Sequence, residues 1–265
     1  MNIAFLKLRV ADDAWLVMDR GPDRDGEPDW ASVARSACHR SRGASASGIV
    51  VVTRGESRHQ ARAWDRTGES RALGPAAALC AARWLFDAGR SRADLIAIDG
   101  EGGETEVLVL DSRNFGLALG EATLPSGGAL GTGTAAARLL ERPKGPADGM
   151  GSMTVALRGE LLRVRIFDGL PEGRPSDRRP AVTAACISRS LLSVRRGRAD
   201  ALLAAAASCA VAAALDCAEP ELSVTAGGET ILVQRPDGPG LFVAAEASYC
   251  LSGELWIPEA GDQAK

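Results

Sequence analysis

Apolar and polar residues alternate along most of the chain, in short runs separated by turn residues. Alternation over four to eight residues, or a compact β-branched run, is typical of a strand. In the first half this pattern predicts strands at residues 2–9, 14–19, 48–53, 61–65, 94–99, 105–111 and 115–119. In the second half it predicts strands at residues 153–157, 161–167, 181–188, 191–195, 222–225, 230–234, 241–245 and 247–256.

Helices are few in this pattern. Residues 29–35 predict a short helix capped by Asp29 or Ser32. An alanine-rich block predicts a longer helix that begins near Pro75 and ends before Gly89, since proline suits a first helical turn and glycine suits the residue after a helix end. A second alanine-rich block predicts a helix over residues 200–216.

The two alanine-rich blocks belong to an internal repeat. Gly-Gly-Glu-Thr occurs at 102–105 and again at 227–230, 125 positions later, and Cys80 and Cys209 are 129 positions apart. Such spacing indicates one fold unit written twice. We therefore expect an α+β protein with two pseudo-symmetric halves, each a curled, mostly antiparallel sheet around a central helix.

The expected halves are residues 1–124 and 152–265, and the last strand is free to return to the first half. Between them, 125–151 is rich in glycine and proline and predicts a linker, with a helical turn at 135–141. A polar loop is expected at 171–179. The two halves are expected to enclose a cleft for a ligand.

Composition excludes several classes of function. The net charge of −3 gives no general attraction to nucleic acid or an acidic membrane, and no run of about 18 apolar residues predicts a membrane span. Six scattered cysteines without CxxC spacing, and only two histidines, predict a reduced, cytoplasmic protein without a metal site. The glycines at 131–134 lack the ending of a phosphate loop, so we expect no cofactor.

Three motifs resemble the diaminopimelate epimerase family over nearly the whole chain. The opening Phe5-Leu-Lys7 with Val17-Met-Asp19 is similar to the family's first strand-turn-strand. The stretch 65–69 followed by Cys80 resembles the family's first glycine-rich motif and cysteine. Residues 195–200 followed by Cys209 resemble the second such motif. The resemblance implies the two-halved fold described above.

The residues that would carry the family's chemistry are changed. Enzymes of this family invert an α-carbon with two opposed cysteines at helix N-termini, and these positions fall on Gly74 and Ala204. The amide cradles fall on residues 75–77 and 205–207, which are proline and alanines. Asp13 and Asp65 stand where the family has asparagines. The resemblance therefore implies the fold but not the two-thiol reaction, and Cys80 and Cys209 match structural cysteines.

Three interpretations of function follow. The chain binds a small molecule in the cleft or a partner protein, without racemase chemistry. Alternatively it is an isomerase or lyase of another class that uses carboxylates in the cleft. Or it uses other cysteines, which would have to converge from unrelated elements. The candidate ligand-binding residues are Asp13, Asp65, Glu69, Arg196, Arg198 and Asp200.

Each candidate residue also has a structural interpretation. Asp65 suits a turn, Asp200 suits a helix N-cap, and the arginines suit a solvated edge. Clustering of two carboxylates and an arginine in one enclosed site would favour the enzyme. The sequence leaves two states open, a monomer and a homodimer that pairs through sheet edges.

Overall fold

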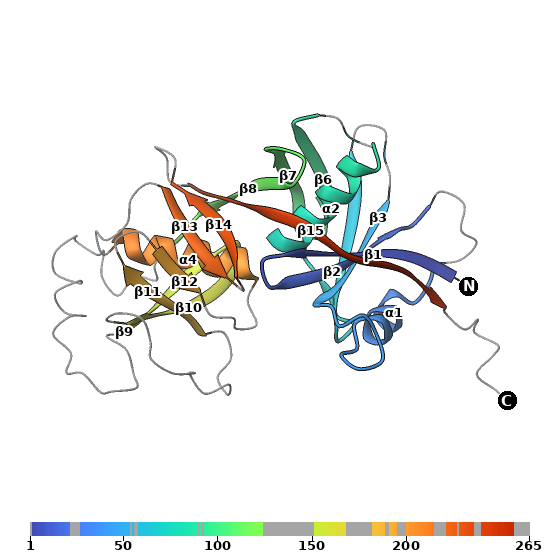
Figure 1. The fold of residues 1–265 in the computed structure, drawn as a ribbon, viewed down its shortest axis with the longest axis horizontal. Coiled ribbons are helices and arrows are strands. Elements are labelled where there is room, and N and C mark those ends of the chain that lie inside the picture. The colour runs from blue at the N-terminus through green and yellow to red at the C-terminus, as the bar shows by residue number, and fades with distance from the viewer. Residues whose placement is uncertain are drawn as a thin grey trace. The chain divides into compact units, whose positions relative to one another are not determined.

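We analysed a computed structural model of the chain (Figure 1). It describes residues 2–21, 27–53, 55, 58–89, 91, 93–123, 151–167, 182–188, 191–194, 200–214, 221–226, 228–235 and 240–256. Two compact units emerge: Met1–Gly116 with Ala247–Lys265, and Leu117–Glu246. Nearly all of the expected linker at 125–151 and the whole loop at 171–179 lie outside the described residues, so the boundaries at 124 and 152 stay a prediction.

The first unit is mostly sheet. Its elements are β1 (Asn2–Val10), β2 (Asp13–Asp19), α1 (Trp30–Ala37), β3 (Gly48–Thr53), β4 (His59–Asp65), β5 (Ser70–Arg71), α2 (Pro75–Asp87), β6 (Leu95–Gly100), β7 (Gly103–Val109), the start of β8 (Asn114–Glu121) and the end of β15 (Gly240–Trp256). The pairs β2–β3 and β4–β6 are parallel, and β1–β2, β3–β4, β6–β7 and β7–β8 are antiparallel.

The sheet of the first unit closes on itself. β15 neighbours β8 in the strand order and also pairs antiparallel with β1, from Asn2↔Trp256 to Val10↔Ala247. The result is a closed, mixed sheet of eight strands, which leaves neither β1 nor β15 as a free edge. Tyr249 of β15 donates a hydrogen bond to Asp87 at the end of α2 (2.7 Å).

Two helices explain why β3 is apolar on both faces. Ile49 and Val51 pack in the cluster that contains Trp30 and Val33 of α1. Val50 and Val52 point to the opposite face, because successive side chains of a strand alternate, and α2 contacts β3. Figure 1 shows α2 among the strands of this unit and α1 outside them.

The alanines of α2 allow the helix to lie close to many strands. α2 contacts β1, β2, β3, β6 and β7, and every residue from Pro75 to Ala82 is buried. A methyl side chain keeps helix propensity high while adding little width, so several strands can approach one helix. The predicted start at Pro75 is confirmed, and Gly89 follows the end with φ +64°.

The second unit is also mostly sheet. Its described elements are the end of β8, β9 (Gly151–Leu157), β10 (Glu160–Phe167), β11 (Val182–Ser188), β12 (Leu191–Val194), α4 (Ala201–Ala214), β13 (Glu221–Ala226), β14 (Glu229–Gln234) and the first part of β15. The pairs β10–β11 and β12–β13 are parallel, and β9–β10, β11–β12, β13–β14 and β14–β15 are antiparallel.

α4 is the apolar helix of the second unit. It contacts β9, β10, β11, β12, β13 and β14, and residues 201–209 are buried. A helix that is apolar on all sides is stable only when it is covered on all sides. No helix in the described part of the chain is long and apolar enough to cross a membrane.

Candidate functional site

The N-terminus of α2 is the first place that the resemblance marks. Gly74 is the N-cap, with extended backbone (φ −68°, ψ 160°), and its carbonyl accepts from the amide of Ala78 (2.9 Å). Gly74 offers no side chain to cap the helix, and Pro75 offers no amide hydrogen. This helix end therefore carries neither a thiol nor another side chain that moves protons.

Asp65 lies in the turn that leads to this helix. Its Oδ1 accepts from the amide of Thr67 (2.8 Å), the Thr67 hydroxyl (2.5 Å) and the amide of Glu69 (3.1 Å). Its Oδ2 accepts from Nε and a terminal nitrogen of Arg71 (3.3 and 3.2 Å). These five hydrogen bonds support the structural interpretation of Asp65 as a turn residue.

These contacts fix the charge of Asp65. Burial acts to raise the pKa of its carboxyl group, but the hydrogen bonds from Thr67 and Arg71 outweigh burial and lower the pKa below its ordinary value. Asp65 is ionised at neutral pH. A general acid near neutrality needs the opposite shift, so this position does not suit one.

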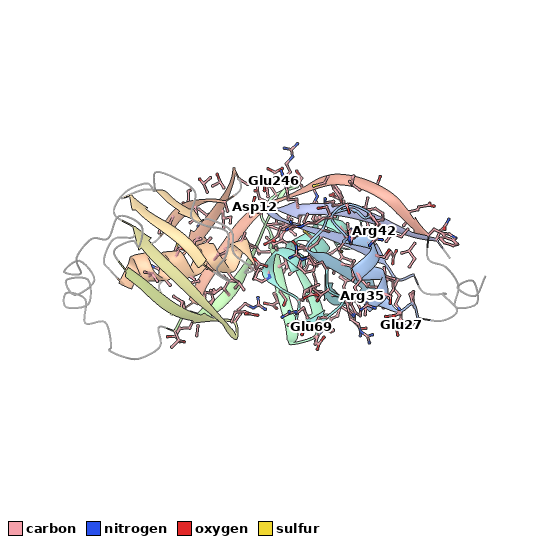
Figure 2. The ribbon with its side chains drawn as sticks, turned by 90° about the horizontal axis from the view of Figure 1, so that it is seen from below. Asp12, Glu27, Arg35, Arg42, Glu69 and Glu246 are labelled. Carbon is pink, nitrogen blue, oxygen red and sulfur yellow. The ribbon has the colours of Figure 1, made fainter. Side chains whose placement is uncertain are left out.

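Glu69 joins the same turn through Arg71, a residue outside the predicted site. Arg71 contacts the carboxylate of Glu69 at 2.8 Å, and the two residues are i and i+2 along an extended segment, on one face. The Glu69 side chain is 65% exposed, and Figure 2 shows it at the surface. Two carboxylates and an arginine do meet here, but the site they form is open to solvent.

Asp13 lies at the same end of the sheet. It accepts from the Ser47 hydroxyl (3.1 Å), and the Ser47 carbonyl accepts from the amide of Arg66, next to Asp65. The strand register explains this, because Gly48 pairs with both Trp15 and Asp65. Asp13 is buried, and Ser47 links it to the turn of Asp65.

The N-terminus of α4 begins where the alanine-rich block predicted, with Asp200 as the N-cap. α4 starts at Ala201, and Asp200 precedes it: its Oδ1 accepts from the amide of Leu202 (2.9 Å) and its carbonyl accepts from the amide of Ala204 (3.0 Å). Ala204 therefore lies one turn inside the helix, buried, rather than at its tip. Alanine propensity extends the helix back to the first side chain that can cap it.

The predicted arginines, Arg196 and Arg198, lie outside the described residues. A different arginine, Arg158, lies close enough to Asp200 for their charges to interact. Partial desolvation lowers the pKa of Arg158, and the charge of Asp200 acts in the other direction. Arg158 precedes Gly159 in the β9–β10 turn, a position that gives no sequence signal of its own.

The cysteines of known placement are mostly buried. Cys38, Cys80 and Cys209 are buried and Cys250 is exposed; the side chain of Cys186 and the residue Cys217 are outside the description. Burial raises the pKa of Cys209 to about 12, and burial together with the charge of Asp65 raises that of Cys38 to about 12. Such thiols stay protonated at neutral pH. Within the described ranges no group of His, Cys, Asp and Glu could hold a metal ion.

Comparison with known proteins shows the fold. No protein-family model and no curated protein matches the chain. Among solved structures it is similar to a phenazine biosynthesis protein of the PhzF family from Enterococcus faecalis, with a TM-score of 0.67 and 10% identity over 97% of this chain and 100% of that one.

Two further structures carry racemase or epimerase descriptions. One is a predicted epimerase from Pseudomonas aeruginosa, with a TM-score of 0.66 and 14% identity over 97% of this chain and all of the other. The second is a hydroxyproline epimerase from Agrobacterium vitis with bound trans-4-hydroxy-L-proline, with a TM-score of 0.60 and 9% identity over 98% and 94% of the two chains. The chain therefore has the fold of these PhzF-family and epimerase structures, and its narrower resemblance to diaminopimelate epimerases stays a prediction.

Proposed function

We propose that this chain uses an isomerase fold for binding and does not perform two-thiol epimerisation. One observation carries the proposal: the N-caps of α2 and α4 are Gly74 and Asp200, so neither is a cysteine. The nearest helical thiols are Cys80 and Cys209, about 9 and 13 Å further along their helices at the rise of an α-helix. Both are buried.

Burial also argues against proton transfer by these thiols. A cysteine base must be a thiolate, and a helix N-terminus favours the thiolate because its free amides carry partial positive charge. Cys209 is instead buried, and burial raises its pKa to about 12, which keeps the thiol protonated. The proposed role is therefore recognition, either of a small molecule in the cleft expected between the halves or of a protein partner. We expect this role in the cytoplasm and without a cofactor.

Solvent deuterium exchange tests the absence of epimerase chemistry. The purified chain is incubated in D₂O with trans-4-hydroxy-L-proline, L-proline and LL-diaminopimelate, and α-deuterium is followed by mass spectrometry. We expect no incorporation above the rate without protein. Cys209→Ala and Cys80→Ala are matched controls: incorporation that either substitution abolishes would overturn the proposal.

Binding is tested separately by thermal unfolding with the same compounds. A ligand that binds only the folded state stabilises it by about 2.7 kcal/mol at a ligand concentration of a hundred times the Kd. The unfolding midpoint therefore rises. We expect a rise with at least one small carboxylate and no exchange of its α-proton. Exchange together with stabilisation would instead identify an enzyme.

A second candidate function is an isomerase or lyase that uses carboxylates. Asp200 favours it, because a carboxylate stands at the N-terminus of α4 with the charge of Arg158 nearby. Asp13 is a further candidate because it is buried. Asp65 is the weakest, since its pKa is lowered. Deuterium exchange that Asp200→Asn removes, and that both cysteine variants keep, would favour this function over binding alone.

We also infer that the two units are copies of one ancestral unit. In each, the successive pairs are antiparallel, parallel, antiparallel, parallel, antiparallel and antiparallel, and the alanine-rich helix falls before the second parallel pair is completed. In the first copy of the repeated Gly-Gly-Glu-Thr, β7 begins at Gly103, and in the second copy β14 begins at Glu229. Sequence and topology thus support the same inference independently.

A further inference from the structure

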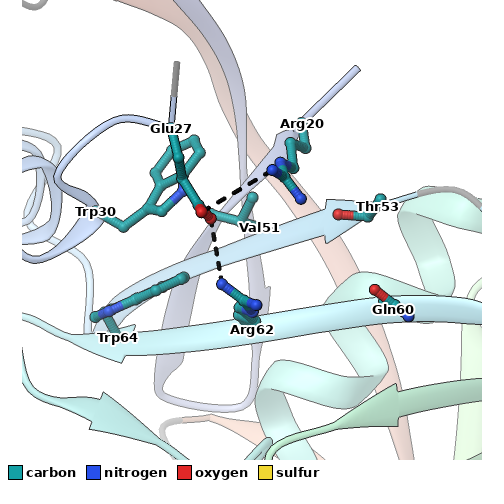
Figure 3. A pocket seen from close by; sticks show the side chains of 8 residues that line it. All are labelled: Arg20, Glu27, Trp30, Val51, Thr53, Gln60, Arg62 and Trp64. Atoms are coloured by element: carbon teal, nitrogen blue, oxygen red, sulfur yellow. Dashed lines mark hydrogen bonds and ion pairs between the residues drawn. The ribbon is translucent and has the colours of Figure 1, made fainter. Parts of the chain in front are cut away.

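A pocket lies beside the start of α1 in the first unit (Figure 3). Its cavity volume is about 20 Å³, room for about one water molecule, so a ligand enters only where the Glu27 side chain gives way. The residues that matter are Arg20, Glu27, Trp30, Gln60, Arg62 and Trp64. Three of them, at 60, 62 and 64, alternate along β4 and share its outer face.

One wall of the pocket is aromatic. The rings of Trp30 and Trp64 have centroids 6.1 Å apart and planes inclined by 32°. Trp30 is only 4% exposed, and its indole Nε1 is buried with no hydrogen-bond partner. Figure 3 shows that nitrogen on the side of the pocket where Glu27 lies. A buried donor without a partner is costly, so an acceptor placed here would be stabilised.

The other wall carries an excess of positive charge. The Glu27 carboxylate lies between two guanidinium groups, 3.2 Å from Arg62 and 4.0 Å from Arg20. Two cations therefore face one anion. The three side chains are 42–62% exposed, and ion pairs in water are weak, so Glu27 can be displaced by another carboxylate.

We propose that this pocket binds a small planar carboxylate. Its carboxylate group takes the place of the Glu27 carboxylate between Arg20 and Arg62, where guanidinium groups bind carboxylates with paired hydrogen bonds. Its flat body lies against the indole of Trp64, and a carboxylate oxygen accepts from Trp30 Nε1. The ring supplies contact area and the arginines supply orientation.

Benzoate is the probe for this proposal. Titration of the full chain at constant ionic strength, followed by tryptophan fluorescence, is expected to saturate with a Kd on the order of 1 mM, as befits a ligand of few atoms. Acetate, which lacks the ring, and benzyl alcohol, which lacks the charge, are expected to bind at least about tenfold more weakly. Absence of saturation with benzoate overturns the proposal, as does equal binding of all three.

Three substitutions place the probe in the pocket. Arg62→Gln is expected to raise the Kd about tenfold or more, because a charged hydrogen bond is lost. Arg58→Gln is the matched control, since Arg58 is 64% exposed and pairs with Glu104 instead. Glu27→Gln removes the competing carboxylate and is expected to lower the Kd. Equal effects of the two arginine variants, or weaker binding by Glu27→Gln, overturn the proposal.

The fluorescence signal itself provides a further check that does not depend on affinity. Trp64→Phe is expected to remove most of the change, whereas Trp256→Phe, at a residue 67% exposed on β15, is expected to keep it. Both variants keep an aromatic ring and are checked for folding by thermal unfolding. A change that disappears with Trp256→Phe and persists with Trp64→Phe overturns the assignment.

Discussion

The helices α2 and α4 follow corresponding strands of their units but begin with different chemistry. Gly74 caps α2 with its carbonyl alone and precedes a proline, whereas Asp200 caps α4 with both its carbonyl and its carboxylate. Both helix interiors are alanine-rich and buried. Both helices therefore have small residues where strands pack closely against them, whereas the residue at the start of each helix differs in its capping group.

The largest expected effect tests whether the two helices are equally central. Leu79 in α2 and Leu202 in α4 are both 0% exposed. We expect Leu79→Ala and Leu202→Ala each to reduce the free energy of unfolding by about 2–5 kcal/mol, because each leaves a cavity. Urea unfolding measures this, with Leu95→Ala (46% exposed) as a control of small effect. A loss below about 1 kcal/mol in one helix alone would show that the two helices are not equally central to stability.

The second effect concerns the caps. Asp200→Ala is expected to cost about 1 kcal/mol, because the amide of Leu202 loses its acceptor. Gly74→Ala is expected to change stability by only a few tenths of a kcal/mol, since no side-chain cap is lost. Thermal unfolding of both variants measures the difference between the two caps. Equal losses would mean that the carboxylate of Asp200 does not cap α4 in solution.

The smallest effect appears only in acid. The pKa of Asp65 is lowered in the folded chain, so its ionised form stabilises folding above the unfolded pKa of about 3.9, and this contribution is lost as pH falls through the folded value. We expect Asp65→Asn to flatten the loss of stability below about pH 4. Urea midpoints across pH 3–6 measure it, with exposed Glu106→Gln as control. An unchanged pH profile in Asp65→Asn would contradict the contacts around this carboxylate.

Local signals predicted most of the described fold. Asp29 caps α1 through the amide of Ser32 (3.2 Å), Pro75 begins α2, and the strands fall close to the expected runs. These features depend on neighbours in sequence, so period and capping chemistry reveal them. The closing of the sheet does not depend on such neighbours: the pairing of β1 with β15 joins residues about 250 apart, and no local pattern shows that these two strands pair.

The candidate site was less predictable. The start of α4 at Asp200 was predicted, but the family motif marked Ala204, which lies one turn inside the helix. Asp65 was a candidate carboxylate by sequence, but hydrogen bonds from Arg71 and the Thr67 hydroxyl stabilise its ionised form. Trp30 and Trp64 lie 34 positions apart, and nothing in either local pattern shows that their rings meet.

The closing pairing of β15 with β1 has a consequence for synthesis. The ribosome makes β1 first, but the partner residues Ala247–Trp256 follow Gly116 by about 130 residues. At about 5–20 residues per second, one edge of the nascent sheet waits roughly 7–26 seconds for its partner. During that interval β1 exposes hydrogen-bonding groups that attract other strands, so a chaperone that shields nascent edges should raise the yield of this protein more than that of one whose barrel closes early.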